Sequence, residues 1–234
     1  MTRLSVIVPV LNEEKTLQEI VRSLYATSLP DCELEVIVVD DGSEDRTPAI
    51  IRELQNVHPG LKALRHPRRR GKGAGVRTGI AASSGDILVI QDADLEYQPA
   101  DIPRLIRPIT AGLADAVYGS RFVSPERRVG YFWTTKANQG ITAFANLCYN
   151  TNFTDVYTGY KAMRGPLARG LRLQSASFTI EVELTAKLRR AGARFYEVPI
   201  AYQARTYKEG KKIRLADALR ALFAILYHRF SRLR

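Results

Sequence analysis

The fold is decided by one stretch, Asp86-Ile87-Leu88-Val89-Ile90-Gln91-Asp92-Ala93-Asp94. Its apolar run, Ile87–Ile90, is short and unbroken, which is typical of a strand buried on both faces of a parallel sheet. Two carboxylates, Asp92 and Asp94, follow directly after that run. Open parallel sheets carry their active sites just beyond the carboxyl ends of the strands. The stretch therefore predicts an α/β fold with a functional site at this edge of the sheet.

Strands and helices alternate on both sides of this stretch. Leu4–Val10 and Glu35–Val39 are apolar runs, and a helical spacing of apolar residues follows the first of them over Glu13–Tyr25. The same alternation predicts a helix beginning near residue 45, a weak strand at 61–64, helices at 73–83 and 99–111, and a strand at 114–118. Strand followed by helix, repeated along the chain, is the βαβ pattern. We therefore predict a Rossmann-like, mostly parallel sheet with helices on both faces.

The regularity weakens after Gly119. Arg121–Lys136 is too irregular to assign as one element. Residues 137–149 and 178–190 have helical spacing, and 194–201 has the pattern of a strand that closes the sheet. No internal repeat or low-complexity linker interrupts the chain, which favours one continuous domain.

That domain is predicted to cover residues 1–212, and residues 213–234 to form a basic amphipathic helix. Residues 208–234 contain eight basic and two acidic side chains. The apolar residues of the helix recur at helical spacing: Leu215, Leu219, Leu222, Phe223, Leu226 and Phe230. Such a helix either lies on an anionic membrane or packs on its own domain, and the sequence leaves both readings open.

The composition is that of a globular protein with a polyanionic partner. The 234 residues are 45% hydrophobic and 25% charged, with a formal net charge of +11. This excess points to nucleic acid, an anionic membrane or nucleotide phosphates. Cys32 and Cys148 are isolated, so we expect reduced thiols and no zinc site. The N-terminus has no signal-peptide pattern and no run approaches the roughly 20 apolar residues of a membrane span, so we expect any membrane contact to be peripheral.

Three carboxylates alternate after the deciding strand: Asp92, Asp94 and Glu96. In an extended segment, alternate side chains face the same side, so their oxygens would converge on one point. Such oxygens suit Mg²⁺ or Mn²⁺ with open positions for phosphate. The alternative is a charged surface turn.

Two other segments predict contacts to a nucleotide. Asp40 and Asp41 follow a strand and could accept hydrogen bonds from ribose or a base, although one of these residues or Ser43 could instead cap the next helix. Lys72 lies in a basic, glycine-rich stretch that leads into a helix, where phosphate is attracted. The stretch matches neither a P-loop nor a dinucleotide fingerprint. The three histidines lie away from these carboxylates, so a hydrolase with a histidine base is unsupported.

Taken in order, these motifs resemble glycosyltransferase family 2 with the GT-A fold, and within it the polyprenyl-phosphate glycosyltransferases. The matching segments span about residues 4–212: Val6-Ile7-Val8-Pro9-Val10-Leu11-Asn12-Glu13, Val36-Ile37-Val38-Val39-Asp40-Asp41-Gly42-Ser43, Gly71-Lys72-Gly73, Asp92-Ala93-Asp94-Leu95-Glu96, Gly119-Ser120-Arg121-Phe122, Thr158-Gly159-Tyr160-Lys161, Phe195-Tyr196-Glu197-Val198-Pro199-Ile200, Arg205 and Glu209-Gly210-Lys211-Lys212.

The resemblance implies roles for individual residues. The donor nucleotide would be bound by Pro9, Asn12, Glu13, Asp40, Asp41, Lys72 and Asp92. The metal, Mg²⁺ or Mn²⁺, would be held by Asp92, Asp94 and Glu96. Phosphate groups of donor or acceptor would meet Arg121, Lys136, Arg205 and Lys211, and the catalytic set would be Asp94, Arg121 and Arg205. One segment departs from the family pattern, because Lys136 stands where the lipid-phosphate relatives have a glycine.

The expected reaction is attack by a lipid phosphate oxygen on the anomeric carbon of a GDP- or UDP-linked sugar, with inversion. The acceptor would be a dolichyl or undecaprenyl phosphate at the cytoplasmic face of the membrane. A phosphate monoester has a second pKa near 6, so the nucleophile is already ionised and needs no strong base. The departing diphosphate would be stabilised by the cation and by Lys and Arg side chains.

Two alternatives belong to other classes of acceptor or partner. A family 2 enzyme that uses a saccharide or protein hydroxyl would need a general base, for example Asp155 or Glu181. A nucleic-acid-binding module could use the basic and aromatic stretch Arg121–Lys136, but the carboxylates at the strand ends would then repel the phosphates. We therefore expect no nucleic-acid partner.

Overall fold

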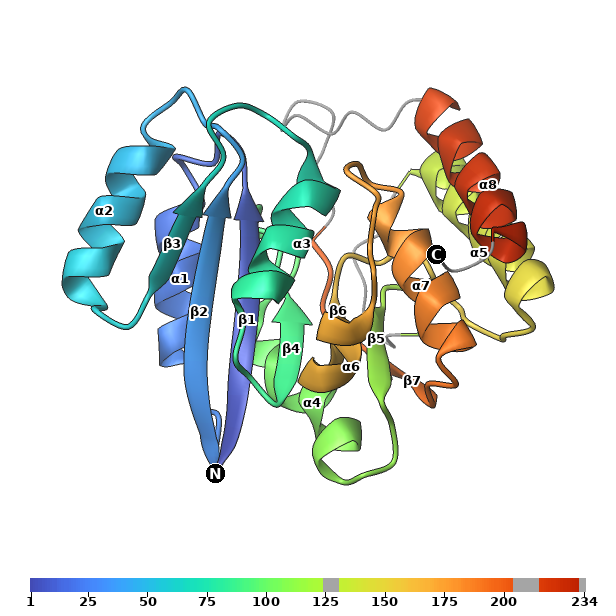
Figure 1. The fold of residues 1–234 in the computed structure, drawn as a ribbon, viewed down its shortest axis with the longest axis horizontal. Helices are drawn as coiled ribbons and strands as arrows, with labels where there is room; N and C mark the ends of the chain where they lie inside the picture. Colours follow the sequence, from blue (N-terminus) through green and yellow to red (C-terminus); the bar gives the residue numbers. More distant parts are fainter. Residues whose placement is uncertain (124–130, 204–214, 232–234) are drawn as a thin grey trace.

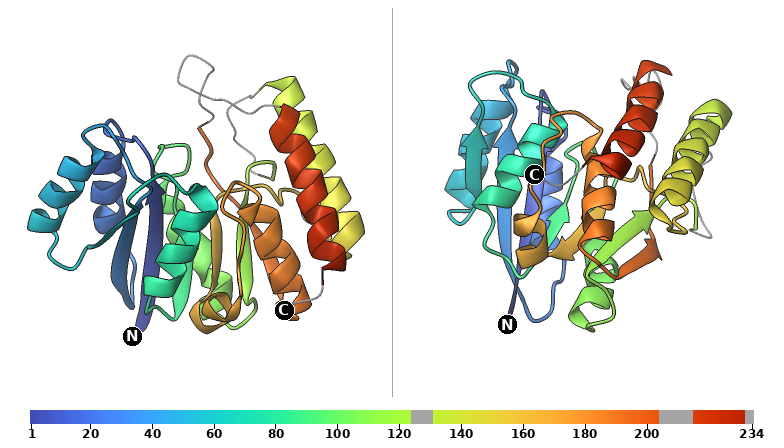
Figure 2. Two further views of the ribbon diagram at one scale, coloured as in Figure 1. Left: turned by 45° about the horizontal axis from the view of Figure 1, so that its top comes forward. Right: turned by 45° about the vertical axis from the view of Figure 1, so that its right-hand side comes forward.

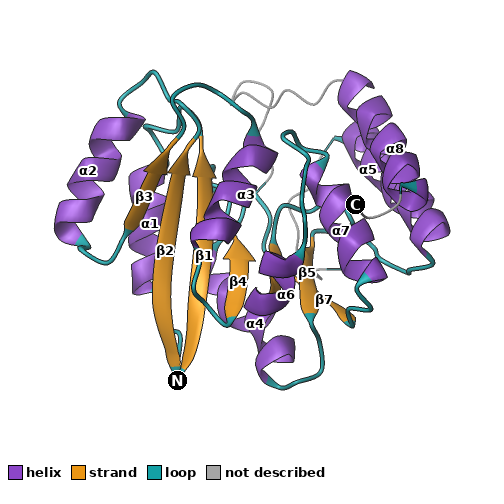
Figure 3. Cartoon of the chain, viewed as in Figure 1, coloured by secondary structure: helices purple, strands orange, loops and turns teal. Residues whose placement is uncertain are grey.

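The strands of the computed structural model form one seven-stranded sheet (Figure 1, Figure 3). The structure describes residues 1–123, 131–203 and 215–231. The strands are β1 (Thr2–Val10), β2 (Cys32–Asp40), β3 (Lys62–Arg65), β4 (Ile87–Ile90), β5 (Ala116–Ser120), β6 (Lys161–Arg164) and β7 (Phe195–Pro199).

Eight α-helices and one short 3₁₀ helix are found among the described residues. They are α1 (Leu17–Ala26), α2 (Thr47–Val57), α3 (Lys72–Ala82), η1 (Pro99–Asp101), α4 (Ile102–Thr110), α5 (Phe132–Tyr149), α6 (Gly165–Gly170), α7 (Ile180–Arg190) and α8 (Leu215–Phe230). In these parts of the chain, no helix has the length and apolar character that crossing a membrane requires.

The strand order is β3-β2-β1-β4-β6-β5-β7. Strands β1 to β4 pair in parallel, and so do β5 and β7. Strand β6 lies between β4 and β5 and is antiparallel to both. The prediction of a mostly parallel sheet with helices on both faces is confirmed.

Two apolar layers cover the sheet, because the buried side chains of β1 alternate between its faces. Leu4, Val6, Val8 and Val10 join a core with α1, α2 and α4, whereas Ile7 points into a second core with α3, α5, α6, α7 and α8. Figure 2 shows α8 beside α5 at one end of the molecule in both views. The C-terminal helix thus belongs to the same packed unit as the sheet.

Most predicted elements are found within a few residues of their expected bounds, but three differences matter for the site. Helix α1 begins at Leu17 rather than Glu13, because residues 13–16 form a turn. Helix α5 begins at Phe132, inside the segment judged too irregular for one element. Strand β6 was not predicted, because it begins and ends with charged residues and has no apolar run.

Candidate active site

The candidate site lies at the edge of the sheet where β1, β2 and β4 end, and α3 begins at this same edge (Figure 1). Loops after these strands are joined by hydrogen bonds. The backbone N–H of Asn12 donates to Ser43 Oγ (2.9 Å), and the N–H of Glu44 donates to Asn12 Oδ1 (2.9 Å). Asn12 can adopt the left-handed conformation, φ 55°, that this turn requires. The sheet edge is therefore held together by Ser43 and by Asn12, which the sequence predicted as a nucleotide contact.

The carboxylates Asp92, Asp94 and Glu96 lie in a bend rather than an extended segment. Leu95 has φ 60°, so the alternation on which convergence depended is interrupted. The N–H of Glu96 donates to Asp94 Oδ1 (3.2 Å), and the hydroxyl of Tyr202 donates to Glu96 Oε2 (3.0 Å). Within the described ranges, no three His, Cys, Asp or Glu side chains gather in a way that could hold a metal ion. Because of this turn, the three carboxylates do not converge in this structure as the alternation predicted, and their assignment as metal ligands stays a prediction.

The bend is fixed to the far end of the chain. Tyr97 and Tyr202 form an antiparallel bridge, and the N–H of Gln203 donates to Glu96 O (3.0 Å). The side-chain amide of Gln91 donates to the backbone oxygens of Asp92 (3.0 Å) and Tyr97 (3.2 Å). Hydrogen bonds thus connect the predicted metal-binding turn to Tyr202 and Gln203, which follow β7.

Lys72 and Asp92 form the central ion pair of the site. The ammonium of Lys72 lies 2.8 Å from Asp92 Oδ1 and donates to Oδ2 at 2.9 Å. The side chains are 14% and 18% exposed, so the pair is partly desolvated but reachable. Burial alone would lower the pKa of Lys72, but Asp92 and Glu181 hold it well above its usual value. The predicted phosphate-binding lysine and the predicted metal-binding carboxylate are brought together.

Glu181, at the start of α7, extends this pair into the core. Its Oε1 atom lies 3.1 Å from Lys72 Nζ, and its Oε2 atom accepts a short hydrogen bond from Lys161 on β6. Lys161 is fully buried, donates also to the backbone oxygen of Thr158, and lies over the ring of Tyr118 at 4.7 Å. Burial opposes the charge on Glu181, yet the two lysines lower its pKa. Two cations and two carboxylates therefore alternate from β4 to β6.

Glycines allow the backbone to close around these charges. A Cβ atom added at Gly159 would lie 2.5 Å from Asp92 Oδ2 and 3.1 Å from Lys72 Nζ. One added at Gly71 would lie 2.2 Å from the backbone oxygen of Ala176, and Gly71 has φ 100°. A side chain is sterically excluded at Gly71, and at Gly159 it would displace the charged ends of Asp92 and Lys72. The Gly-Lys-Gly and Thr-Gly-Tyr-Lys segments therefore meet at the ion pair.

Asp40 and Asp41 are turned into the protein. Asp41 accepts hydrogen bonds from His66 Nδ1 (2.7 Å) and from the N–H groups of Arg70 (2.9 Å) and Gly71 (2.7 Å). Asp40 accepts from the N–H of Ser43 (2.8 Å) and lies 3.1 Å from Arg65 Nε. Both residues are at most 3% exposed. In this structure they hold the loops of the edge and do not present free carboxylates to a nucleotide.

Pro9 and Glu13 also have structural contacts. A Cβ atom on Gly75 of α3 would lie 3.2 Å from Pro9 Cβ, so strand and helix approach closely there. The N–H of Glu13 donates to Thr47 Oγ1 (2.9 Å), and Glu13 Oε2 accepts from Thr16 Oγ1 (2.8 Å). The N-cap position of α2 is Arg46, which makes no side-chain capping hydrogen bond, and the N–H of Thr47 donates instead to Asp45 Oδ1 (2.9 Å).

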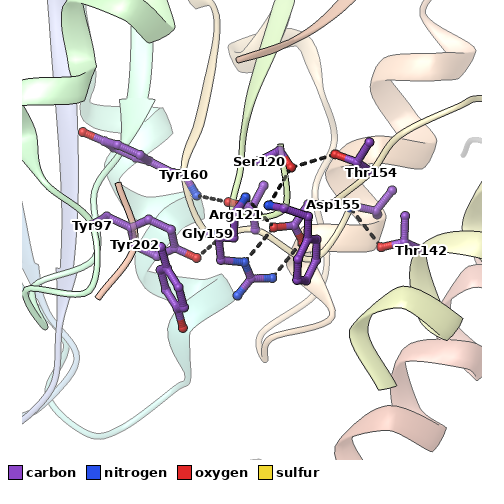
Figure 4. Close-up of polar contacts among 12 residues, drawn as sticks. Tyr97, Ser120, Arg121, Thr142, Thr154, Asp155, Gly159, Tyr160 and Tyr202 are labelled. Atoms are coloured by element: carbon purple, nitrogen blue, oxygen red, sulfur yellow. Dashed lines mark hydrogen bonds and ion pairs between the residues drawn. The ribbon is translucent and has the colours of Figure 1, made fainter. Parts of the chain in front are cut away.

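Arg121 faces a buried carboxylate (Figure 4). Its Nε and Nη2 atoms donate to Asp155 Oδ2 (2.6 Å) and Oδ1 (2.8 Å), a bidentate pair. Asp155 is fully buried, and the guanidinium lies over the ring of Tyr202 at 5.2 Å. Arg121 was predicted to contact phosphate, but in this structure two nitrogens of its guanidinium group donate hydrogen bonds to Asp155.

The other predicted phosphate contacts are placed differently. Lys136 is exposed on the first turns of α5 and donates to Gln139 Oε1 (3.2 Å). Arg205 and Lys211 lie outside the described residues. The structure therefore gives no position for two of the four predicted phosphate contacts.

The fold and the site define a class: an α/β protein with a mostly parallel sheet and charged groups at the carboxyl edge of that sheet. The family model described as glycosyl transferase family 2 matches residues 5–171. The chain belongs to this family and is a glycosyltransferase.

Curated relatives have similar sequences. The chain is 31% identical over 212 residues to the dolichol-phosphate mannosyltransferase of Pyrococcus furiosus, covering 89% of this chain and 59% of the relative. It is 32% identical over 219 residues to the undecaprenyl-phosphate mannosyltransferase of Micrococcus luteus, covering 89% of this chain and 87% of that protein. The chain thus spans well under two thirds of the Pyrococcus enzyme but most of the Micrococcus one.

Solved structures support the fold. The chain is similar to glucosyl-3-phosphoglycerate synthase from Mycobacterium tuberculosis in complex with Mn²⁺, UDP-glucose and phosphoglyceric acid, with a TM-score of 0.72 and 25% identity. That match covers 97% of this chain and 79% of the other. A complex of the same synthase with Mg²⁺ and UDP gives a TM-score of 0.72 at 24% identity.

Sequence reasoning named Glu181 only as a possible general base and Lys161 only as part of a motif, and it did not predict that they contact the Lys72–Asp92 pair. Glu181 stands in the first turn of α7, where an acidic residue reads as a favourable partner of the helix dipole. Lys161 was noted as part of a motif, but a lysine is rarely expected at zero exposure. Only their approach in three dimensions identifies them as part of the site.

Proposed function

We propose that this chain transfers a sugar from a nucleotide-diphosphate sugar to a polyprenyl phosphate, with inversion at the anomeric carbon. The observation that carries the proposal is the state of two carboxylates in the acceptor half. Asp155 is engaged by Arg121, and Glu181 is engaged by Lys161 and Lys72. A hydroxyl acceptor needs a carboxylate that can take a proton, whereas a phosphate acceptor does not. The names of the two mannosyltransferase relatives support the same acceptor class.

The carboxylates at the end of β4 fit a cation held partly by the substrate. Mg²⁺ is usually bound by one or two carboxylates together with substrate phosphates rather than by a cage of protein ligands. Asp92 and Asp94 would hold the ion, and Mg²⁺ or Mn²⁺ at that position would act as a Lewis acid toward the departing diphosphate. Glu96, which accepts from Tyr202, positions the turn. The Mn²⁺ and Mg²⁺ complexes of the mycobacterial synthase support this use of a metal.

The chain's own residues would supply the remaining steps. The ammonium of Lys72 and the N-terminus of α3 attract the donor diphosphate. The loops held by Asp40, Asp41 and Asn12 keep that edge rigid around the nucleotide. Lys136 on α5, and Arg205 and Lys211 after β7, would meet the phosphate of the acceptor. The acceptor phosphate attacks already ionised, so no residue has to remove its proton.

We propose further that α5 and α8 bring the enzyme to the cytoplasmic face of the membrane as a peripheral protein. Helix α8 packs on the domain through Ala221, Ile225 and His228, which are buried. It exposes a second apolar face, with residues at helical spacing: Leu219, Phe223, Leu226, Tyr227 and Phe230. The C-terminal helix can therefore pack on its own domain through one face and contact a membrane through the other.

Helix α5 adds large apolar side chains beside α8. Phe132 and Trp133 are exposed on its first turn, and Leu147 near its end. Aromatic side chains favour the membrane interface, and nearby basic residues such as Arg220 and Arg229 favour anionic lipids. A bilayer that carries the acceptor lipid fits this combination of charge and apolar area better than a second protein surface does.

The acceptor class is tested with two lipids that differ only in the reacting group. We expect transfer to a polyprenyl phosphate and none to the matching polyprenol, measured with UDP- and GDP-linked sugars and Mg²⁺ or Mn²⁺. Transfer to the polyprenol, or to a saccharide, would instead support the hydroxyl-acceptor alternative. The same assay identifies the nucleotide.

Membrane docking is tested by flotation on vesicles that contain an anionic lipid. We expect the double variant Phe223→Ser/Phe230→Ser to float much less than the native chain. Its control is Val57→Ser/Leu113→Ser, which removes two other apolar side chains that are more than half exposed, from other surfaces. Equal flotation of the two variants would remove the docking proposal and leave the transferase proposal unaffected.

A further inference from the structure

Lys72 has two carboxylate neighbours but uses them unequally. Its ammonium donates a hydrogen bond to Asp92 and lies close to both oxygens of that carboxylate. Glu181 Oε1 lies at an ion-pair distance, 3.1 Å, yet this buried oxygen has no hydrogen bond of normal geometry. A buried acceptor without a donor is costly, so its persistence calls for a physical reason. Glu181 Oε1 is therefore a second carboxylate position within reach of the Lys72 ammonium, and Lys72 does not fully satisfy it in this structure.

The carboxylate of Asp92 is occupied by a cation that belongs to the protein. A divalent ion bound at Asp92 would have to compete with the Lys72 ammonium, because two cations at one carboxylate repel each other. Glu181 is fixed by Lys161, itself fully buried, so it cannot turn away to solvent. The steric closure at Gly159 further confines the ammonium to the space between the two carboxylates.

We propose that Lys72 is an exchangeable counterion, which neutralises Asp92 until a divalent cation binds there and then takes Glu181 as its partner. This inference rests on the proposed function, since it takes Asp92 as a metal-binding residue. Glu181 and Lys161 are positioning residues: they act on the metal site only through Lys72. When the cation binds, the Lys72 ammonium leaves Asp92 but stays between Glu181 and the donor site. Cation binding would therefore make this ammonium available to the diphosphate of the donor.

The experiment measures Mn²⁺ affinity by calorimetry or electron paramagnetic resonance, without donor or acceptor. Lys72→Met removes the competitor, so we expect Mn²⁺ to bind about tenfold more tightly, equivalent to about 1.4 kcal/mol. The paired variant Lys161→Met/Glu181→Gln removes the second position for the ammonium and leaves the net charge unchanged. We expect it to bind Mn²⁺ several-fold more weakly.

The mechanism requires that these effects are not additive. In the Lys72→Met background, the pair variant should have no effect on Mn²⁺ affinity, because there is no ammonium to relocate. A role of Glu181 and Lys161 in folding alone would instead lower the affinity equally in both backgrounds. That result, or unchanged affinity of Lys72→Met, would overturn the inference. Thermal unfolding without metal checks that the variants are folded, as expected when both partners of a buried pair are removed together.

Asp92→Asn separates this inference from the proposed function. If Asp92→Asn binds Mn²⁺ as tightly as the native chain, the proposed metal site is wrong and the counterion inference falls with it. If Asp92→Asn weakens binding but Lys72→Met does not strengthen it, only the counterion inference is overturned.

Discussion

Two of the buried ion-pair groups among the described residues differ in how completely their polar atoms are paired. Arg121 and Asp155 form a bidentate pair, and the backbone N–H of Arg121 also donates to Asp155 Oδ2 (3.2 Å). Lys72 is shared between Asp92 and Glu181, and one buried oxygen of Glu181 lacks a hydrogen bond. The first group has a single low-energy arrangement. The second has two nearby positions for one ammonium.

This difference indicates that the Arg121–Asp155 pair stabilises the fold, whereas the Lys72 group belongs to the candidate site. A closed bidentate pair fixes the relative positions of the segments that supply it, here the residue after β5 and the loop before β6. A shared cation can respond to a ligand, because its partners can change at small cost. The predictions below test this division, beginning with the largest expected effect.

Arg121→Met should destabilise the fold by about 3–5 kcal/mol, because it leaves the fully buried carboxylate of Asp155 without a counterion. Urea denaturation gives the measurement. Arg121→Met/Asp155→Leu, which removes both charges, should recover much of the loss. The control is Arg3→Met, whose partner Glu33 is exposed, and its loss should be far smaller. If Arg121→Met and Arg3→Met cost the same, Arg121–Asp155 is not a scaffold pair.

Asp94→Asn should lower the transfer rate by about 10³-fold, since the cation's stabilisation of the leaving group contributes several kcal/mol. Its fold should be unchanged, as judged by the unfolding midpoint. Asp31→Asn is the matched control: it removes an exposed carboxylate just before β2, far along the strand from the site. Removal of metal with EDTA should reduce native activity to a similar level. Full activity of either the variant or the EDTA-treated enzyme would contradict the metal proposal.

Gly159→Ala should disturb the Lys72–Asp92 pair directly, because the added Cβ would lie 2.5 Å from Asp92 Oδ2. We expect a loss of about 1–3 kcal/mol in stability, the range for overpacking a buried position. Gly140→Ala is the control, since nothing lies within 4 Å of its added Cβ on α5. That change should stabilise the protein by about 0.5–1 kcal/mol through helix propensity. Equal effects at the two glycines would show that the backbone at 159 does not confine the pair.

Glu35, at the opposite end of β2 from the site, provides a pH test of a purely structural carboxylate. Burial would raise its pKa, but hydrogen bonds from Lys62, Ser5 and Ser84 bring the pKa of Glu35 to about 2 from 4.5. Because the folded pKa is the lower one, its contribution is fully present above pH 4.5 and is lost as the pH falls toward 2. Glu35→Gln should therefore flatten the acid dependence of stability in this window, measured by urea denaturation at several pH values. An unchanged acid dependence would contradict the assignment.

The first half of the fold was predicted well from sequence, whereas in the second half the prediction missed β6 and the beginning of α5. A strand that is buried on both faces must be apolar along its whole length, so its sequence predicts it directly. This applies to Ile87–Ile90 and Val36–Val39. Strand β6 is just as central in the sheet, but it begins with Lys161. From sequence alone, a lysine such as Lys161 is predicted to lie on the surface. Its burial is expected only once its partner, Glu181, is known to lie beside it.

The candidate site shows the same limit. Its members Lys72 and Asp92 were predicted, because glycine-rich turns and strand ends leave local signals. The expected convergence of Asp92, Asp94 and Glu96 failed at Leu95, whose left-handed backbone no alternation rule anticipates. The contacts of Asp40 and Asp41 also lie outside local pattern: Asp41 accepts hydrogen bonds from groups 25 to 30 residues away in the sequence, and Asp40 forms an ion pair with Arg65.

The sequence by itself determined the α/β class, the sheet edge that carries the site, and the family, since these depend on short-range apolar patterns and ordered motifs. Only the tertiary structure decided which charges are paired, because pairing depends on distance in space between residues far apart along the chain. It placed Lys72 between two carboxylates and turned Arg121 toward Asp155. These pairings affect stability because burying an unpaired charge costs free energy, so a buried charge needs a counterion within the protein.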